Sequence, residues 1–197
     1  MISFFKKVLS GRTKKHLFGT FLIYGFIALS MIVTKVLIAR FYGQEALGIF
    51  TFFFSTAGLV FLFTSFGFPE AITQTIVKEP GKIRSVTKLA LIYSIPLTLF
   101  FVCVTYFIPF FSGIKEYFWE FALYIICYSV FYLMYSIFRG MKKFEEGSFY
   151  SLLNRIFFIG FILVGGWFVF DFSNILVLMS VALVIATIIS LPRVLTF

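Results

Sequence analysis

The sequence predicts an all-α, polytopic membrane protein that folds as a bundle of six transmembrane helices. Hydrophobic residues make up 61% of its 197 positions, and charged residues only 13%. The mean hydropathy is +1.04. An ordinary soluble domain is about half apolar and a quarter charged, so the composition excludes that class. The charged residues also gather between long apolar runs, as they do in the loops of membrane proteins.

Six apolar runs are long enough to cross about 30 Å of hydrocarbon as helices. They are predicted at Leu17–Ala39, Leu47–Phe66, Leu89–Phe111, Phe118–Phe138, Phe149–Phe170 and Ile175–Leu191. Residues 1–16 are predicted to form a basic cytoplasmic segment, and residues 17–197 a single transmembrane lobe. The first run has full span length and no small-residue cleavage site, which indicates a retained helix and not a signal peptide.

The distribution of basic residues predicts the orientation of the bundle. If the N-terminus is cytoplasmic, only Lys35, Arg40 and Lys115 of the seventeen lysines and arginines fall on the other side. Cytoplasmic loops of membrane proteins carry the excess of lysine and arginine. We therefore expect a multi-pass protein of the cytoplasmic membrane with both termini in the cytoplasm.

The fourth span has a polar face that lipid cannot satisfy. At about 100° per residue, one side of this helix collects several tyrosines and an arginine. The members are Tyr117, Glu120, Tyr124, Tyr128, Tyr132, Tyr135 and Arg139. Two interpretations remain open: the tyrosines line a water-filled cavity for a sugar-bearing substrate, or they anchor the interface and bond neighbouring helices.

The first and fifth spans also carry polar side chains. In the first span these share one side of the helix, namely Thr20, Tyr24, Ser30, Thr34 and Lys35. In the fifth span Asn154 and Arg155 lie several residues inside the run. Lys35 and Arg155 are candidates for binding a phosphate in a cavity, and the alternative is that both extend to the membrane surface.

The second span has a different pattern, a narrow stripe of small residues. It consists of Gly48, Thr51, Ser55, Gly58 and Ser65. Such stripes let a neighbouring helix approach closely. We expect this stripe to pack against another helix.

The sequence lacks the side chains that intramembrane catalysis requires. No apolar run contains paired carboxylates, a histidine cluster, a phosphate-binding glycine loop or a nucleophile with its base. We therefore expect no enzymatic activity, no cofactor and no metal. The basic residues lie in short clusters beside spans, which indicates membrane orientation and not nucleic-acid binding.

Two stretches carry a recognisable pattern. The first, Val36 to Lys78, has the sequence ARFYG closing the first span, Glu45 and Gly48 opening the second, and GFP before Ala71. The second is FRGMKKFEEGSFYSLLNRIF, from Phe138 to Phe157. Together with the topology, these stretches resemble the polysaccharide flippases of the multidrug/oligosaccharidyl-lipid/polysaccharide exporter superfamily.

The resemblance implies an all-helical lobe that faces a central cavity and exports lipid-linked oligosaccharide units by alternating access. Related flippases for peptidoglycan precursors place cationic residues late in the first span, where Lys35 lies. Drug antiporters of the superfamily generally use an acidic residue in that span, and this sequence has none there. Family members usually have twelve or more spans, so the chain is expected to be an N-terminal lobe, with a self-pairing half-transporter as the alternative.

The function expected from the sequence is therefore that of a flippase for lipid-linked oligosaccharide or polysaccharide repeat units. The expected cavity residues are Lys35, Tyr24, Thr34, Tyr124, Tyr128, Tyr132, Tyr135, Arg139, Asn154 and Arg155. The expected partners are the lipid-linked glycan, membrane lipids, and either a C-terminal lobe or a second copy. The alternatives are a structural or assembly membrane protein and a related small-molecule exporter.

Overall fold

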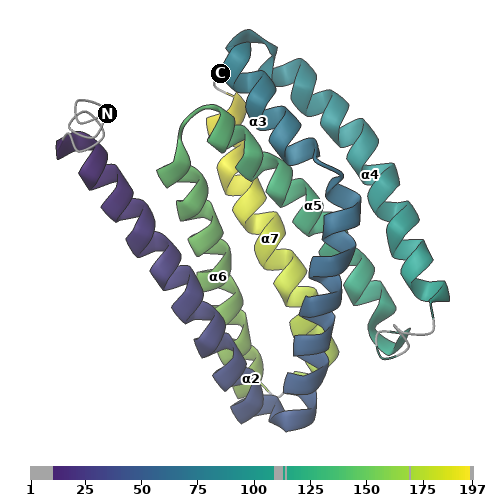
Figure 1. The fold of residues 1–197 in the computed structure, drawn as a ribbon. Coiled ribbons are helices and arrows are strands. Elements are labelled where there is room, and N and C mark those ends of the chain that lie inside the picture. The colour runs from purple at the N-terminus through teal and green to yellow at the C-terminus, as the bar shows by residue number, and fades with distance from the viewer. Residues whose placement is uncertain (1–10, 109–112, 114, 169, 196–197) are drawn as a thin grey trace, which may run out of the picture.

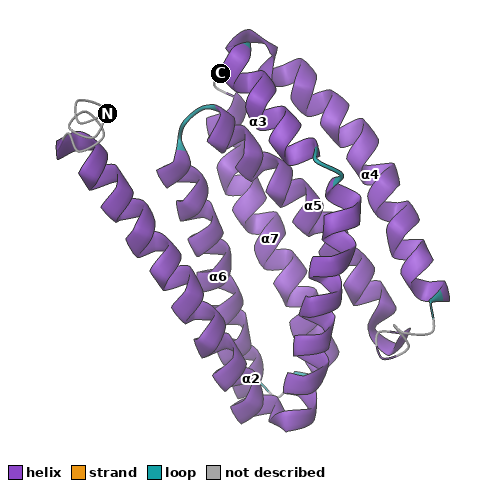
Figure 2. Cartoon of the chain, in the orientation of Figure 1, coloured by secondary structure: helices purple, strands orange, loops and turns teal. Residues whose placement is uncertain are grey.

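The computed structural model describes residues 11–108, 113, 115–168 and 170–195, and within these ranges the chain forms helices joined by short turns and loops, without strands (Figure 2). The helices are α2 (Gly11–Ser65), α3 (Phe68–Lys78), α4 (Ile83–Phe107), α5 (Phe118–Gly140), α6 (Phe144–Trp167) and α7 (Phe172–Leu195), with the 3-10 turn η1 (Pro80–Lys82) between α3 and α4. Five of these helices are long and apolar enough to cross a membrane. The all-α membrane bundle predicted from the sequence is confirmed.

Helix α2 contains both of the first two predicted spans. Its backbone departs from helical geometry at Gly43, where φ is 88° and ψ is 176°. This positive φ is a conformation that glycine adopts without a Cβ clash. The chain reverses direction there (Figure 1). We call residues 11–42 the first arm of α2 and residues 44–65 the second arm.

The two arms of α2 form a V in front of α5, α6 and α7 (Figure 1). Phe41 and Tyr42, at the base of the V, lie against Gly166 and Gly165 of α6, where an added Cβ would be 2.6 Å from the Phe41 ring and 2.9 Å from the Tyr42 hydroxyl. The two glycines therefore let the base of the V pack directly on α6. The start of α2 and the end of α7 lie at the same end of the bundle (Figure 1).

Helix α3 was not among the predicted spans. It follows a break at Phe66 and Gly67, both of which have positive φ, and Pro69 lies in its first turn. Ile72 and Ile76 of α3 are buried. Its polar side is joined to α5 by a hydrogen bond from Thr73 Oγ1 to the Ser136 carbonyl (3.2 Å). A glycine and a proline before an amphipathic run were the signal for this short helix.

Gly140, the last residue of α5, permits the close approach of α3. A Cβ added at Gly140 would lie 2.8 Å from Ile76 Cβ and 3.3 Å from the Thr73 carbonyl oxygen. Neither atom moves without its backbone. We therefore expect Gly140→Ala to destabilise the fold by about 1–3 kcal/mol, as overpacking does in other tightly packed sites.

Thermal unfolding of the purified protein in detergent measures this effect. Gly160→Ala in α6 is the matched control, because no atom lies within 4 Å of a Cβ added there. Replacing a helical glycine by alanine at an open position is neutral or stabilising. Equal melting temperatures for the two variants would contradict the tight contact at Gly140.

Candidate functional site

Four tyrosines follow one another along the face of α5 that looks toward the V. Tyr124, Tyr128, Tyr132 and Tyr135, which we call the tyrosine ladder, have successive ring-centroid distances of 5.7, 6.1 and 5.8 Å. Their spacing of four, four and three residues places them on a single helical face. The ladder therefore extends for about 16 Å along the helix axis, at 1.5 Å per residue.

One end of the ladder lies in the core and the rest borders a cavity. Tyr124 is 4% exposed and packs on Phe53 and Phe54 of the second arm. Phe61, from the same arm, meets the edges of Tyr128 and Tyr132 at 4.8 and 4.9 Å. These contacts fix the ring orientations and leave the hydroxyl side of the ladder toward α6 and the first arm.

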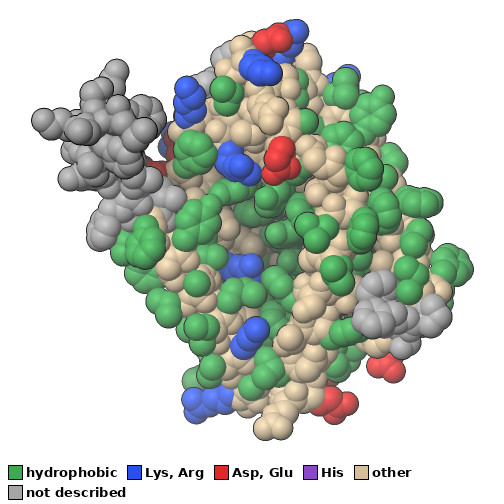
Figure 3. All heavy atoms as spheres, viewed as in Figure 1, with side chains coloured by type: hydrophobic (Ala, Val, Ile, Leu, Met, Phe, Trp, Pro, Cys, Tyr) green, Lys and Arg blue, Asp and Glu red, His purple; other side chains and the backbone are tan. Residues whose placement is uncertain are grey.

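The cavity beside the ladder has a volume of 240 Å³, and we call it the tyrosine cleft. Helices α2, α5 and α6 line it. The lining residues are Tyr24, Ile27, Tyr128, Phe131, Tyr132, Tyr135, Ser148, Ser151, Asn154 and Arg155. Figure 3 shows this face of the molecule hollowed between the arms of the V, with basic side chains in and below the hollow.

Arg155 places a positive charge in the tyrosine cleft. It is the twelfth residue of α6, which begins at Phe144. Arg155 is therefore about 17 Å along the helix axis from that end. Its side chain lines the tyrosine cleft. Its guanidinium carbon lies 5.4 Å from the centre of the Phe54 ring, a cation–π contact. Within the described ranges, no carboxylate is paired with it.

The neighbouring Asn154 adds an acceptor without a partner. Its Oδ1 atom is buried and receives no hydrogen bond from the described residues. A buried amide oxygen without a donor is costly, since folding removes it from water. Among the described residues, the cleft thus contains one cation without a carboxylate partner and one acceptor without a donor, next to a row of phenolic hydroxyls.

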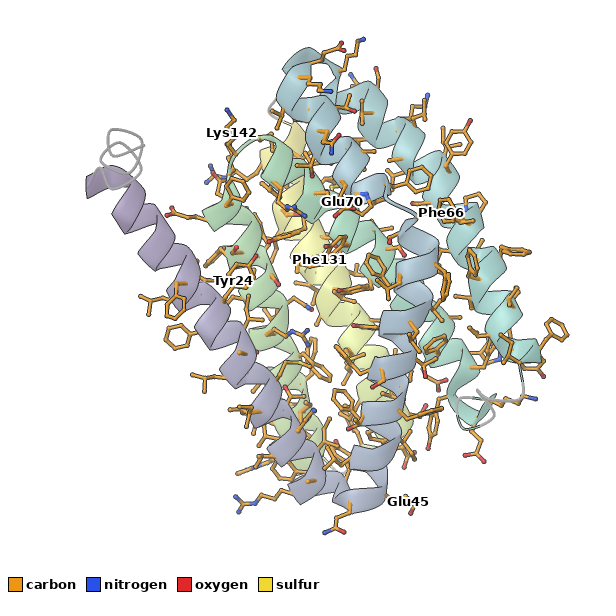
Figure 4. The ribbon with its side chains drawn as sticks, viewed as in Figure 1. Tyr24, Glu45, Phe66, Glu70, Phe131 and Lys142 are labelled. Carbon is orange, nitrogen blue, oxygen red and sulfur yellow. The ribbon has the colours of Figure 1, made fainter. Side chains whose placement is uncertain are left out.

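Tyr24 joins the first arm of α2 to the ladder. Its hydroxyl hydrogen-bonds to the hydroxyl of Tyr135, at 2.5 Å. Figure 4 shows Tyr24 on the first arm, toward α6, and Phe131 on α5 in the middle of the bundle. This bond links the two sides of the cleft toward the end of the bundle where α2 begins.

The structure brings together six of the ten candidate residues predicted from the sequence. Tyr24, Tyr128, Tyr132, Tyr135, Asn154 and Arg155 all line the tyrosine cleft. The other four lie elsewhere, and for them a role in substrate binding stays a prediction. Tyr124 is in the core beside the cleft, and Thr34 is fully buried.

Lys35 and Arg139 are the two predicted cations outside the cleft. Lys35 is exposed on the first arm and does not line the cavity. Arg139 lies at the end of α5, where its guanidinium is 3.8 Å from the carboxylate of Glu70. Figure 4 labels Glu70 near that end of the bundle.

Sequence reasoning missed Ile27, Phe131, Ser148 and Ser151. The two serines precede Arg155 by seven and four residues, so the three share one face of α6. Their spacing from Arg155 was the signal in the sequence that could have placed them in the site. Gly147 is equally important for the site, because a Cβ there would lie 3.2 Å from the Tyr135 ring. This glycine allows α6 to approach the ladder.

The small-residue stripe of the second arm differs from the expectation. Gly48, Thr51, Ser55 and Gly58 are exposed, and no atom lies within 4 Å of a Cβ added at either glycine. Ser65, the fifth member, is half-buried beside residues of α3, α4 and α5, so the expected packing is absent only along the first four positions in the part of the chain that the structure describes. The core contacts of the second arm are made instead by its other side, through Phe50, Phe53, Ala57 and Val60.

Comparison with known proteins identifies the family. The sequence profile of the family described as "Polysaccharide biosynthesis protein" matches residues 14–196. No curated protein and no solved structure matches the chain. The profile covers the helical bundle from the fourth residue of α2 onward, including every residue that lines the tyrosine cleft. The chain is a multi-pass membrane protein and belongs to the polysaccharide biosynthesis protein family.

Proposed function

We propose that the chain is a transporter, and not an enzyme, which moves lipid-linked oligosaccharide or polysaccharide repeat units across the cytoplasmic membrane. The observation that carries this proposal is the position of Arg155, a cation halfway along a membrane-spanning helix and directed into a cleft lined by tyrosines. Ionisable residues at such depth mark substrate pathways. A guanidinium suits a phosphate, and tyrosine combines a flat ring with a hydroxyl for sugar.

Removal of the gene in the cell that carries it tests the proposal. Lipid-linked repeat units should accumulate in the cytoplasmic leaflet, where periodate added from outside does not oxidise their sugars. An assembly protein predicts the loss of a partner protein with no protected glycolipid pool. A small-molecule exporter predicts greater sensitivity to a toxic compound with unchanged glycolipid. Either of these results would replace the flippase proposal.

The exposed small-residue stripe supports a partner for this bundle. Four of its five residues are exposed, whereas Phe50, Phe53, Ala57 and Val60 of the same arm are buried in the core. A second lobe or a second copy of the chain, placed there, would give the open cleft its missing wall, as alternating access requires. The transporter is accordingly proposed to work with such a partner.

The proposed orientation places the start of α2 and the end of α7 in the cytoplasm. Lys115 precedes the start of α5, and Lys142 follows its end; both are exposed. Because α5 crosses the membrane in this proposal, the two lysines mark opposite sides of it. With Cys103 and Cys127 replaced, an impermeant thiol reagent should label Lys115→Cys in intact cells but not Lys142→Cys. Labelling of position 142 alone would reverse the orientation.

The tyrosine hydroxyls are expected to bind the glycan. Tyr128→Phe and Tyr132→Phe remove one hydroxyl each and leave the ring contacts with Phe61 in place. Each should weaken transport by about 1 kcal/mol, or several-fold in affinity, with little change in protein yield. Tyr93→Phe is the matched control, since Tyr93 is exposed on α4 outside the cleft. Reduced yield with normal transport by the remaining protein would instead indicate a packing role.

A further inference from the structure

A second cavity, larger than the tyrosine cleft, lies on another side of the first arm of α2. Its volume is 860 Å³, within the range of about 300–1,000 Å³ that ligand sites occupy. We call it the lateral groove. It is lined by Gly19, Leu22, Ile23, Phe26, Glu145, Glu146, Phe149, Tyr150, Leu152 and Arg193. None of these residues lines the tyrosine cleft.

The groove exists because the first arm diverges from α6. The two helices are in direct contact near Gly43, through Phe41 and Gly166, and they separate toward the start of α2 (Figure 1). On that part of the arm Leu22 and Phe26 remain 44% and 58% exposed. The first arm therefore leaves a space between itself, α6 and α7.

Polar and apolar residues occupy different depths of the groove. Glu145 and Glu146 are in the first turn of α6, and Arg193 is in the last turn of α7. These charges lie at the end of the bundle. Phe149 and Leu152 follow on α6, about 5 and 10 Å deeper at 1.5 Å per residue. A charged end above an apolar body, confined to one leaflet, has the polarity of a membrane lipid.

Glu146 supplies the most specific feature of the groove. Its Oε1 atom is 3.6 Å from Lys143 Nζ. Its Oε2 atom is buried and receives no hydrogen bond from the described residues. An ammonium group would satisfy this oxygen with a charge-assisted hydrogen bond. A trimethylated amine has no N–H to donate, and a purely anionic head group offers this oxygen no ammonium donor.

We propose that the lateral groove binds one phospholipid whose head group contains a primary ammonium, as in phosphatidylethanolamine. The ammonium donates to Glu146 with Glu145 beside it, the phosphate lies toward Arg193, and an acyl chain extends along Leu22, Phe26 and Leu152. This site is separate from the tyrosine cleft, so the proposal that it binds a lipid does not depend on the proposed transport activity.

Native mass spectrometry of the purified chain tests the proposal with three lipids offered at equal concentration: phosphatidylethanolamine, phosphatidylcholine and phosphatidylglycerol. Phosphatidylethanolamine should be retained in preference to both others. Glu146→Gln should reduce that preference by about tenfold, the effect of losing one strong charge-assisted hydrogen bond. Leu22→Trp should reduce the retention of all three lipids by filling the apolar part of the groove.

Two control variants separate groove effects from general ones. Glu70→Gln removes a carboxylate that pairs with Arg139 outside the groove. Leu29→Trp adds the same bulk at a position on α2 that is 57% exposed and does not line the groove. Both should retain lipid as the wild-type protein does.

Circular dichroism and size-exclusion chromatography establish that each variant is folded. If the Leu22→Trp protein unfolds, Leu152→Trp, on the opposite wall of the groove, replaces it. Equal retention of the three lipids, a preference for phosphatidylglycerol, or no retained lipid would overturn the proposal. Unchanged retention in both the Glu146 and the tryptophan variants would do so as well.

Discussion

Arg155→Glu is expected to abolish export of the lipid-linked glycan while the protein remains folded and present at normal abundance. Two unit charges 4 Å apart interact by about 4 kcal/mol at an effective dielectric constant of 20. Reversing the charge turns this attraction for a substrate phosphate into repulsion, so the loss should be about a hundredfold or more. Export is measured as cell-surface glycan, with protein abundance measured in the same membranes.

Arg155→Lys keeps the charge but loses the planar pair of donors, and it should retain part of the activity. Lys142→Glu is the control for charge reversal, because Lys142 is exposed at the end of the bundle (Figure 4). Lys35→Glu compares the two cations of the spans: since Lys35 does not line the tyrosine cleft, we expect a smaller loss than at Arg155. Wild-type export by Arg155→Glu at normal abundance would remove the arginine from the pathway.

Ser151→Trp is expected to block transport by filling the tyrosine cleft. Ser151 lies one helical turn before Arg155 and lines the same cavity of 240 Å³. An indole there would occupy much of this space and cover the guanidinium. We expect export to fall by about tenfold or more, because a bulky group in the pathway opposes every substrate that enters it.

Ile156→Trp provides the matched control for Ser151→Trp. Ile156 is on the same helix, is 55% exposed and does not line the cleft. The two variants therefore add an indole to α6 in different directions. If both exported normally, the cleft would not be the pathway; if both lost activity equally, the effect would come from α6 as a whole.

Much of the fold was predictable because lipid imposes strong constraints on sequence. Long apolar runs separated by charged loops predicted the helices, and the first two predicted spans correspond to the two arms of α2, which are separated by the non-helical residue Gly43. The helix α3 was missed because its eleven residues are too short for a span and carry charges at both ends. Its position depends on the contact between Ile76 and Gly140, which joins distant parts of the chain.

The tyrosine side of the site was predictable from helical periodicity alone. Tyr128, Tyr132 and Tyr135 share a face at any rotation of α5, and a polar face in a span must meet a cavity or a partner. Which other residues complete the cavity depends on how the helices pack. Periodicity placed Thr34 and Lys35 with Tyr24, but the V-shaped course of α2 brings only Tyr24 to the cleft.

The role of Arg155 also could not be predicted from periodicity alone. Its sequence position left two interpretations open, snorkelling to the surface or lining a cavity. The start of α6 at Phe144, five residues before the predicted boundary, places the arginine near the middle of the helix, and its side chain lines the tyrosine cleft. Helix boundaries are the part of such a prediction that sequence determines least well.

The central claim is that the tyrosine cleft holds the lipid-linked glycan. Photo-cross-linking in the producing cells tests this claim most directly. A benzophenone amino acid is placed at Tyr132 in the ladder or at Leu59, which is 49% exposed on α2 and lies outside the cleft. The account predicts a protein adduct that carries the glycan at position 132 and none at position 59. No glycan adduct at position 132 in a folded protein, or equal adducts at both positions, would contradict it.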